Sequence, residues 1–264
     1  METHGAISAV PAGVARLLCL SSLLFCGAFS PAQAPQSAAH IRYDALTRIF
    51  RIDGASVTYV FGINQNGEFQ SLYWGGELGA SDTFSSPRAY PPLASFDPSI
   101  DTTPQEFTGW GGGLYAVPDL KISFPDGNRD LVLHYVSHRI QGPQLTVVLK
   151  DISRAVYVTL SYRMDESTGI LRRTALVENK TQQPFTIEEA SSGAWNLPPA
   201  DDYHLSYLTG RWGDEWNLQQ ELLHPGKIIL ESRRGSTGHQ NNPWFAIARG
   251  ESADEDHGRV WFGA

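Results

Sequence analysis

The chain has 264 residues, with 28 acidic and 20 basic side chains, and its formal net charge is −8. Such an acidic chain is a poor ligand for nucleic acid or for an anionic membrane, so we expect neither as a partner. The length allows one large domain or two small ones. Beyond the first 34 residues, no apolar run is long enough to form a membrane-spanning helix.

The beginning of the chain has the pattern of a removable secretory signal. Arg16 precedes the apolar run Leu17–Phe29, and small residues follow up to Ala34. The run is too short to cross a bilayer. We predict a signal peptide over residues 1–34, with cleavage after Ala39 as the alternative, and therefore a secreted or periplasmic protein. The competing interpretation is a buried hydrophobic helix at the terminus.

Both cysteines, Cys19 and Cys26, lie inside the predicted signal. The mature part, residues 35–264, would therefore have none, and its stability must come from a packed core and not from disulfides or thiolate metal sites. Removal of the signal takes away one acid, Glu2, and one base, Arg16, so the formal charge stays at −8.

The mature part is rich in short runs of β-branched and aromatic residues, separated by Gly, Pro, Asn and Asp. The segment 213–223 is the nearest candidate for a helix, although it could equally be a turn or a strand. Many short strands at close spacing predict an all-β fold, an antiparallel sandwich with few or no helices apart from the signal peptide. The clearest strand runs are Ala55–Ile63, Leu131–Ile140, 144–151, 155–165 and 169–179.

Two glycine-containing segments predict local backbone structure. Pro125–Gly127 is expected to be a turn, because proline fixes φ and glycine accepts a left-handed conformation. The run Gly109–Gly113 precedes a strand pattern and not a helix, which argues against a phosphate-binding loop. We expect close backbone packing beneath Trp110 instead.

The segment from Gly75 to Gly113 is long, irregular and rich in Gly, Pro and Ser. Long irregular segments in compact domains are usually functional or disordered. This one also carries aromatic residues, which disordered linkers usually lack. We therefore predict an ordered excursion of the chain, either over the rim of the sandwich or onto a partner.

The seven tryptophans and ten tyrosines suggest sugar binding, since aromatic faces stack on the C–H side of sugar rings. The alternative is that these rings fill the core of a sandwich. The best surface candidates lie beside glycines or in loops: Trp74, Trp110, Trp212 and Trp244.

No metal site or nucleophile is evident in the sequence. His134 and His138 would share one face of a strand, but no further ligand completes a metal set, so we expect solvent-facing histidines. The acidic segments Pro199–His204 and Ala253–Gly258 lack the ligand spacing of a calcium loop and are expected to be solvated turns. No G-x-S-x-G nucleophile elbow is present.

Three stretches resemble a known family: Leu72–Leu78 (LYWGGEL), Gly109–Ile140, and Tyr207–Ile247, which contains SRRGSTGHQNNPWFA. Together they closely resemble the N-terminal domain of the family 36 glycoside hydrolases, α-galactosidases of the melibiase and raffinose-cleaving type. The resemblance covers roughly residues 40–264.

The resemblance implies a β-supersandwich of the galactose-mutarotase type over residues 35–264. In the family, a catalytic (β/α)8 barrel with two catalytic aspartates follows this domain. It thus implies that this chain is the non-catalytic supporting and oligomerisation domain of a secreted, retaining α-galactosidase. The whole enzyme would hydrolyse terminal α-1,6-galactosyl residues of raffinose-type oligosaccharides or galactomannans. The chain alone would hold no catalytic residue and be inactive.

The partners implied are an α-galactoside, the chain's own barrel and further copies in a homo-oligomer, without a cofactor or metal. By resemblance, Asp82 and Trp110 are the substrate-binding candidates, with Phe84 as an alternative aromatic, and Ser232–Ala246 is architectural. Two other functions stay open. One is a free-standing carbohydrate-binding sandwich, and the other is a mutarotase-type enzyme, which would need a carboxylate base and a histidine acid in one cleft.

Overall fold

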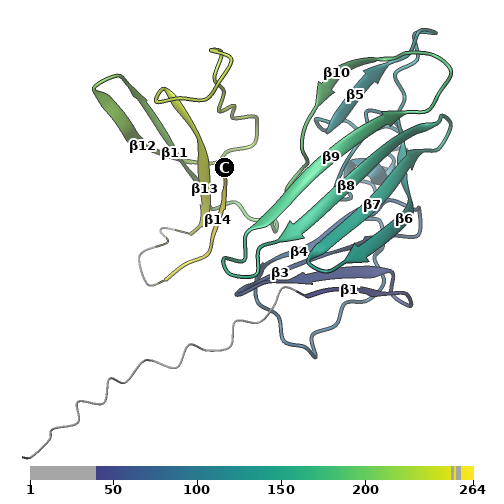
Figure 1. Cartoon of the computed structure of the whole chain (residues 1–264), viewed down its shortest axis with the longest axis horizontal. Helices are drawn as coiled ribbons and strands as arrows, with labels where there is room; N and C mark the ends of the chain where they lie inside the picture. Colours follow the sequence, from purple (N-terminus) through teal and green to yellow (C-terminus); the bar gives the residue numbers. More distant parts are fainter. Residues whose placement is uncertain (1–39, 251–252, 254–256) are drawn as a thin grey trace, which may run out of the picture. The chain divides into compact units, whose positions relative to one another are not determined.

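The computed structural model describes residues 40–250, 253 and 257–264 (Figure 1). Within them there are 14 β-strands, one 3-10 turn at Ser99–Asp101 and no α-helix. Consequently, none of these residues lies in a helix that could cross a membrane. The all-β prediction is confirmed, while the predicted signal peptide lies outside the described residues.

The first sheet has the order β1-β2-β3-β4, and each neighbouring pair is antiparallel. Its strands come directly after one another in the chain, so each connection is a short turn. β3 is buried along almost its whole length, which reflects its central position. The strands are β1 (His40–Asp44), β2 (Ile49–Asp53), β3 (Val57–Ile63) and β4 (Phe69–Gly76).

The second sheet has the order β6-β7-β8-β9 and is also fully antiparallel. β7 and β8 alternate between buried residues and half-buried or exposed ones, as a strand with one face on a core requires. These strands match the sequence predictions to within a few residues. They are β6 (Leu133–Gln141), β7 (Gln144–Asp151), β8 (Val156–Met164) and β9 (Leu171–Asn179).

One hydrophobic core joins these two sheets. Phe61 of β3 stacks on Tyr162 of β8, with ring centroids 4.9 Å apart. Phe50 of β2 packs on Phe61 at 5.5 Å, and Leu160 of β8 is fully buried in the same cluster. Side chains from the inner faces of both sheets therefore interdigitate, which is the packing of a β-sandwich.

A two-stranded sheet completes this part of the fold. β5 (Leu120–Ser123) pairs with β10 (Thr186–Ala190), and the register shifts at a bulge between Ile187 and Glu189. Leu120 and Ile122 of β5 are fully buried and extend the core. The predicted turn follows β5: Gly127 N donates to Phe124 O at 2.9 Å with φ +83° at Gly127, which confirms the prediction.

The third four-stranded sheet has the order β12-β11-β13-β14 (Figure 1). The segment that could have been a helix is a strand, because β12 pairs along nearly its whole length with β11. Tyr203, Leu205 and Trp261 are its buried apolar residues. The strands are β11 (Tyr203–Arg211), β12 (Asp214–Leu222), β13 (Asn241–Arg249) and β14 (Val260–Gly263).

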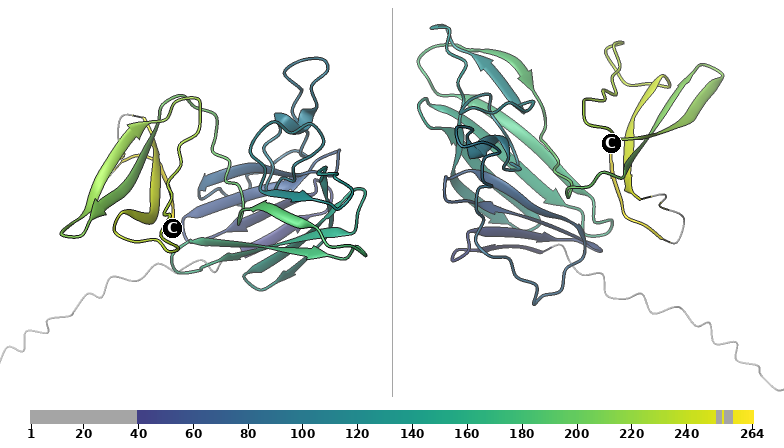
Figure 2. Two further views of the ribbon diagram at one scale, coloured as in Figure 1. Left: turned by 90° about the horizontal axis from the view of Figure 1, so that it is seen from above. Right: turned by 180° about the vertical axis from the view of Figure 1, so that it is seen from behind.

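The long segment between β4 and β5 is ordered, as predicted, and contains the 3-10 turn (Figure 2). Phe107 is buried in the core, whereas Phe96 is 87% exposed. The glycine-rich run confirms the expected close packing, because a Cβ on Gly109 or on Gly111 would overlap the backbone of Leu131. Glycine is thus required there by the approach of two backbone segments.

Candidate functional site

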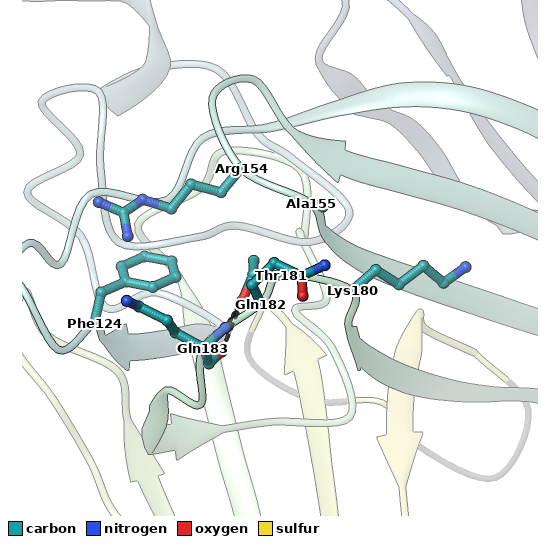
Figure 3. A pocket seen from close by; sticks show the side chains of 7 residues that line it. All are labelled: Phe124, Arg154, Ala155, Lys180, Thr181, Gln182 and Gln183. Carbon is teal, nitrogen blue, oxygen red and sulfur yellow. Dashed lines mark hydrogen bonds between the residues drawn. The ribbon is translucent and has the colours of Figure 1, made fainter.

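A first surface depression lies beside the ends of β5, β8 and β9, with a volume of about 400 Å³ (Figure 3). The Arg154 guanidinium lies over the Phe124 ring at 3.8 Å and donates to Asp126 Oδ2 at 2.7 Å. The seven lining residues are Phe124, Arg154, Ala155, Lys180, Thr181, Gln182 and Gln183.

This depression offers one aromatic ring, two cations and polar amides, but no carboxylic acid among its lining residues. Glycoside hydrolysis normally needs a pair of carboxyl groups that flank the scissile bond. Its cations are also engaged: Arg154 pairs with Asp126, and Lys180 lies 4.6 Å from the centre of the Tyr157 ring. The lining of this depression therefore lacks the pair of carboxyl groups that glycoside hydrolysis normally needs.

A second depression, of about 440 Å³, lies between the β3–β4 turn and the long segment. Two of its lining residues are hydrogen-bonded: Arg48, which has φ +61°, donates from Nη1 to Asn64 O at 3.3 Å. Asn64 in turn donates to Glu68 Oε2 at 2.6 Å. The lining residues are Arg48, Ile63, Asn64, Gln65, Ser86, Pro87 and Arg88, again without a carboxylic acid.

Asp82, the first predicted substrate-binding residue, is exposed in the turn that follows β4. Its Oδ2 accepts a hydrogen bond from Gly79 N at 2.8 Å. Its carbonyl oxygen accepts one from Arg51 Nη1 at 3.3 Å, which ties this turn to β2. The Asp82 side chain is thus held by its turn while it is exposed to solvent, and its sugar-binding role stays a prediction.

Trp110, the second predicted substrate-binding residue, is half-buried, and two cationic side chains lie over its ring. Lys121 Nζ lies 4.3 Å and Arg129 Cζ 5.6 Å from the ring centroid. Glu188 pairs with both cations, at 3.5 and 3.1 Å. A sugar that stacked on this ring would compete with the cation–π contacts. The alternative aromatic residue, Phe84, packs on Tyr73 with ring centroids 6.3 Å apart.

The other tryptophans predicted at the surface lie in different environments. Trp74 is partly buried and packs at a tilt against Trp195 with ring centroids 5.0 Å apart, and Trp244 is half-buried in β13. Trp212 is 85% exposed and Trp216 is 68% exposed, and both lie at the β11–β12 hairpin. Trp216 also has φ +67°, which is an uncommon conformation for a bulky residue. Sequence analysis missed Trp216 because it fell inside the segment considered as a helix.

A charged cluster inside the sandwich was also missed. Glu106 is fully buried and accepts hydrogen bonds from the hydroxyls of Tyr59 and Tyr162, each at 2.9 Å. Arg173 Nη1 lies 3.5 Å from Glu106 Oε2 and donates to Ala194 O at 2.7 Å. Burial raises the pKa of the Glu106 carboxyl, while Arg173 and the tyrosine hydroxyls oppose that rise. The same burial raises the pKa of both tyrosines well above 10.

The strand alternation did contain a signal for Arg173. It lies in phase with Leu171, Ala175 and Val177, the partly buried apolar residues of β9. A charged residue in phase with the apolar face of a strand points inward. No comparable signal marks Glu106, because it lies in the irregular segment.

The two strand histidines do not share a face, so that prediction is wrong. A bulge between Tyr135 and Ser137 shifts the register of β6, and His134 pairs with Lys150 while His138 pairs with Val147. His138 is therefore turned toward the core, where Tyr135 Oη lies 2.7 Å from its Nδ1. Burial lowers the pKa of His138. Among the described residues, no group of three His, Cys, Asp or Glu could hold a metal.

The segment Ser232–Ala246 is largely exposed and internally bonded before it enters β13. Arg233 pairs with Glu231 at 2.7 Å, and Ser232 Oγ donates to Ser236 O at 2.6 Å. The architectural role of this segment at an interface stays a prediction.

The profile described as "Glycosyl hydrolase family 36 N-terminal domain" matches residues 67–264, most of the chain. The chain belongs to this family. Its all-β sandwich is the fold that the resemblance implied, and the three resembling stretches lie wholly or almost wholly inside the matched range.

Curated relatives of the chain are glycoside hydrolases. It is 28% identical over 250 residues to alpha-galactosidase AgaA of Geobacillus stearothermophilus, covering 84% of this chain and 34% of AgaA. It is 23% identical over 237 residues to alpha-galactosidase Mel36A of Lactobacillus acidophilus, covering 78% of this chain and 32% of the relative. The family 36 chain thus spans about a third of the length of these relatives.

Solved structures agree with this relationship. The crystal structure of the family 36 α-galactosidase AgaB from G. stearothermophilus superimposes with a TM-score of 0.76 at 27% identity, covering 84% of this chain and 34% of AgaB. A doubly substituted AgaA in complex with raffinose gives a TM-score of 0.73 at 27% identity, covering 81% of this chain and 33% of AgaA.

Proposed function

We propose that this chain is the N-terminal, non-catalytic domain of a secreted, retaining α-galactosidase. The observation that carries the proposal is the family 36 N-terminal match over residues 67–264, together with curated relatives that are α-galactosidases about three times as long. The crystal structure of AgaA in complex with raffinose supports a raffinose-type α-galactoside as the substrate of the whole enzyme. A galactomannan side chain is the alternative substrate that the family resemblance implies.

The chemistry of the described surface supports a non-catalytic role for this chain. A retaining glycosidase places two carboxyl groups about 5–5.5 Å apart on either side of the scissile bond. Neither surface depression is lined by a carboxylic acid. The most buried acid outside the surface turns, Glu106, is closed off inside the sandwich and inaccessible to a sugar. In this proposal the catalytic pair belongs to the part of the enzyme by which the relatives exceed this chain.

In this proposal the sandwich supports the catalytic part and contributes to a homo-oligomer. Asp82 would reach the substrate entrance, because it is exposed and held by its turn. Trp110 would act at the same entrance only if a sugar displaced Lys121 and Arg129 from its ring. The N-terminal signal pattern supports secretion.

The test compares two purified proteins, residues 35–264 and the complete protein. Release of galactose from raffinose and from a chromogenic α-galactoside is measured for both, with the anomer of the first product followed by NMR. We expect activity and retention of configuration from the complete protein only. Activity of the short chain, or an inactive complete protein, would contradict the proposal.

A second candidate is a free-standing carbohydrate-binding sandwich. The observation that favours it is the exposed aromatic pair Trp212 and Trp216 on one hairpin. Calorimetric titration of residues 35–264 with raffinose and galactomannan separates the two candidates. Binding that is lost in Trp212→Ala and retained in Leu46→Ala, a change of another exposed residue, would favour the binding module.

A further inference from the structure

Asn179 begins the sequence Asn-Lys-Thr, which has the pattern of an acceptor for N-linked glycosylation. The pattern is an asparagine followed two positions later by serine or threonine, with any residue except proline between them. None of the other asparagines in the sequence has serine or threonine at that distance. The chain therefore offers one candidate acceptor for this modification.

The structure places this acceptor at an accessible point. Asn179 is the last residue of β9 and is exposed. β9 is an edge strand, because the second sheet has the order β6-β7-β8-β9. An N-linked acceptor must lie on the surface of a secreted protein, and a turn at the end of an edge strand meets that condition.

The turn after β9 holds the carboxamide of Asn179 by both of its ends. Oδ1 accepts hydrogen bonds from Thr181 N at 2.9 Å and from Thr181 Oγ1 at 2.7 Å, so the hydroxyl of the acceptor pattern contacts the amide that would be modified. Nδ2 donates one of its two hydrogens to Gln183 O at 2.9 Å, which leaves the second for substitution. A substituted amide nitrogen still has one N–H, so modification of Asn179 is compatible with a hydrogen bond to Gln183.

Room for a sugar lies directly beside the acceptor. The first depression, of about 400 Å³, begins at the residue that follows Asn179, and residues 180–183 of the same turn line one side of it (Figure 3). The side-chain amides of Gln182 and Gln183 are among these lining groups, and amides can hydrogen-bond the hydroxyls of a sugar. The depression therefore provides both space and polar contacts for the first sugars of a glycan.

We propose that Asn179 is glycosylated when the chain passes through a secretory pathway that attaches N-linked glycans. The inference rests on the proposed function, because it needs secretion. The co-substrate is an oligosaccharide linked to a lipid diphosphate. Nδ2 of Asn179 forms a bond to the anomeric carbon of the oligosaccharide, the bond from that carbon to the lipid diphosphate breaks, and the amide proton passes to a base of the transferring enzyme. The glycan then covers the end of an edge strand, where unpaired backbone groups are open to pairing with another chain.

The test is peptide mapping by mass spectrometry of the complete protein secreted from a yeast host. Treatment with a peptide N-glycosidase in heavy-oxygen water converts a glycosylated asparagine into an isotopically labelled aspartate. We expect this label on the peptide that contains Asn179 in most of the molecules. The internal control is the peptide with Asn217, which is also exposed but lacks the acceptor pattern and should stay unlabelled.

Two conservative substitutions separate the acceptor from the fold of its turn. Asn179→Asp keeps an oxygen that can accept from Thr181 but has no amide nitrogen, so the glycan should be lost. Thr181→Ser keeps the acceptor pattern and the hydroxyl, so the glycan should remain. Loss of the glycan in Thr181→Ser together with the first variant, or an unlabelled Asn179 peptide in the wild-type protein, would overturn the inference.

The α-galactosidase activity of the same secreted samples keeps this result separate from the proposed function. An active protein with an unmodified Asn179 disproves the glycan alone. An inactive protein with a glycan on Asn179 disproves the α-galactosidase assignment alone. A protein that stays inside the cells with an unmodified Asn179 disproves both the glycan and the secretion on which it rests.

Discussion

The Glu106 carboxylate and the Arg173 guanidinium lie 3.5 Å apart inside the sandwich, with side chains that are 0% and 1% exposed. They link an irregular segment to β9, and Arg173 continues the link by donating to Ala194 O. Gly193 leaves room for this contact, since a Cβ there would lie 2.5 Å from the Arg173 Cζ. The pair therefore holds the chain that leads from the sandwich toward the third sheet.

Replacing Glu106 with alanine should destabilise the protein by about 3–5 kcal/mol, because it leaves a buried guanidinium without its counter-charge. Chemical denaturation of the wild type and Glu106→Ala measures this difference. The matched control is Glu178→Ala, which breaks the exposed pair with Lys180 and should cost less than about 1 kcal/mol. Equal losses of unfolding free energy in the two variants would show that the buried pair contributes no more to stability than the exposed pair.

Leu160 and Leu176 lie on neighbouring strands, and their exposure differs completely: Leu160 is fully buried and Leu176 is 60% exposed. Leu160→Ala should lower the free energy of unfolding by about 2–5 kcal/mol through lost burial and a residual cavity. Leu176→Ala should change it by less than about 0.5 kcal/mol. Urea unfolding of both variants checks this, and a small effect at Leu160 would contradict the assigned core.

Much of the sandwich could be predicted from the sequence, because strands with one buried face have a period of two. The runs over β7 and β8 show that period clearly, and their limits agree closely with the structure. The segment 213–223 does not show this period clearly, because β12 is exposed along nearly its whole length and is not divided into a buried and a solvated face. Its strand conformation comes from pairing with β11, which is a non-local contact.

The sites were harder to predict for a related reason. One bulge in β6 decides the side of the sheet on which His138 lies, because a single inserted residue moves every later side chain of the strand to the opposite side. The cations on Trp110 come from β5 and from a later turn, so no local pattern could show them. The two proposed sugar contacts, Asp82 and Trp110, came from family resemblance and still need the measurements described above.

Gly109→Ala should be strongly destabilising, because the new methyl group would overlap the carbonyl of Leu131 and a backbone segment cannot rotate away as a side chain can. Gly76→Ala is the control: a Cβ there would meet nothing within 4 Å. Differential scanning fluorimetry of the two variants should show a much lower melting temperature for Gly109→Ala only. Similar melting temperatures would mean that the glycine-rich run does not pack closely on Leu131.

Asp165 should contribute to stability at neutral pH and lose that contribution in acid. Hydrogen bonds from the side chains and backbone of Ser167 and Thr168 lower its pKa from 3.8 to about 2. Because the folded-state pKa is depressed, the contribution is complete above the unfolded value and disappears as the pH falls from about 4 through about 2. Asp165→Asn should therefore be less stable than the wild type at pH 7, and the gap should close across that acid window. Denaturation series at several pH values test this, with the exposed neighbour substituted as Glu166→Gln for comparison; a gap that stays constant with pH would contradict the assigned hydrogen bonds.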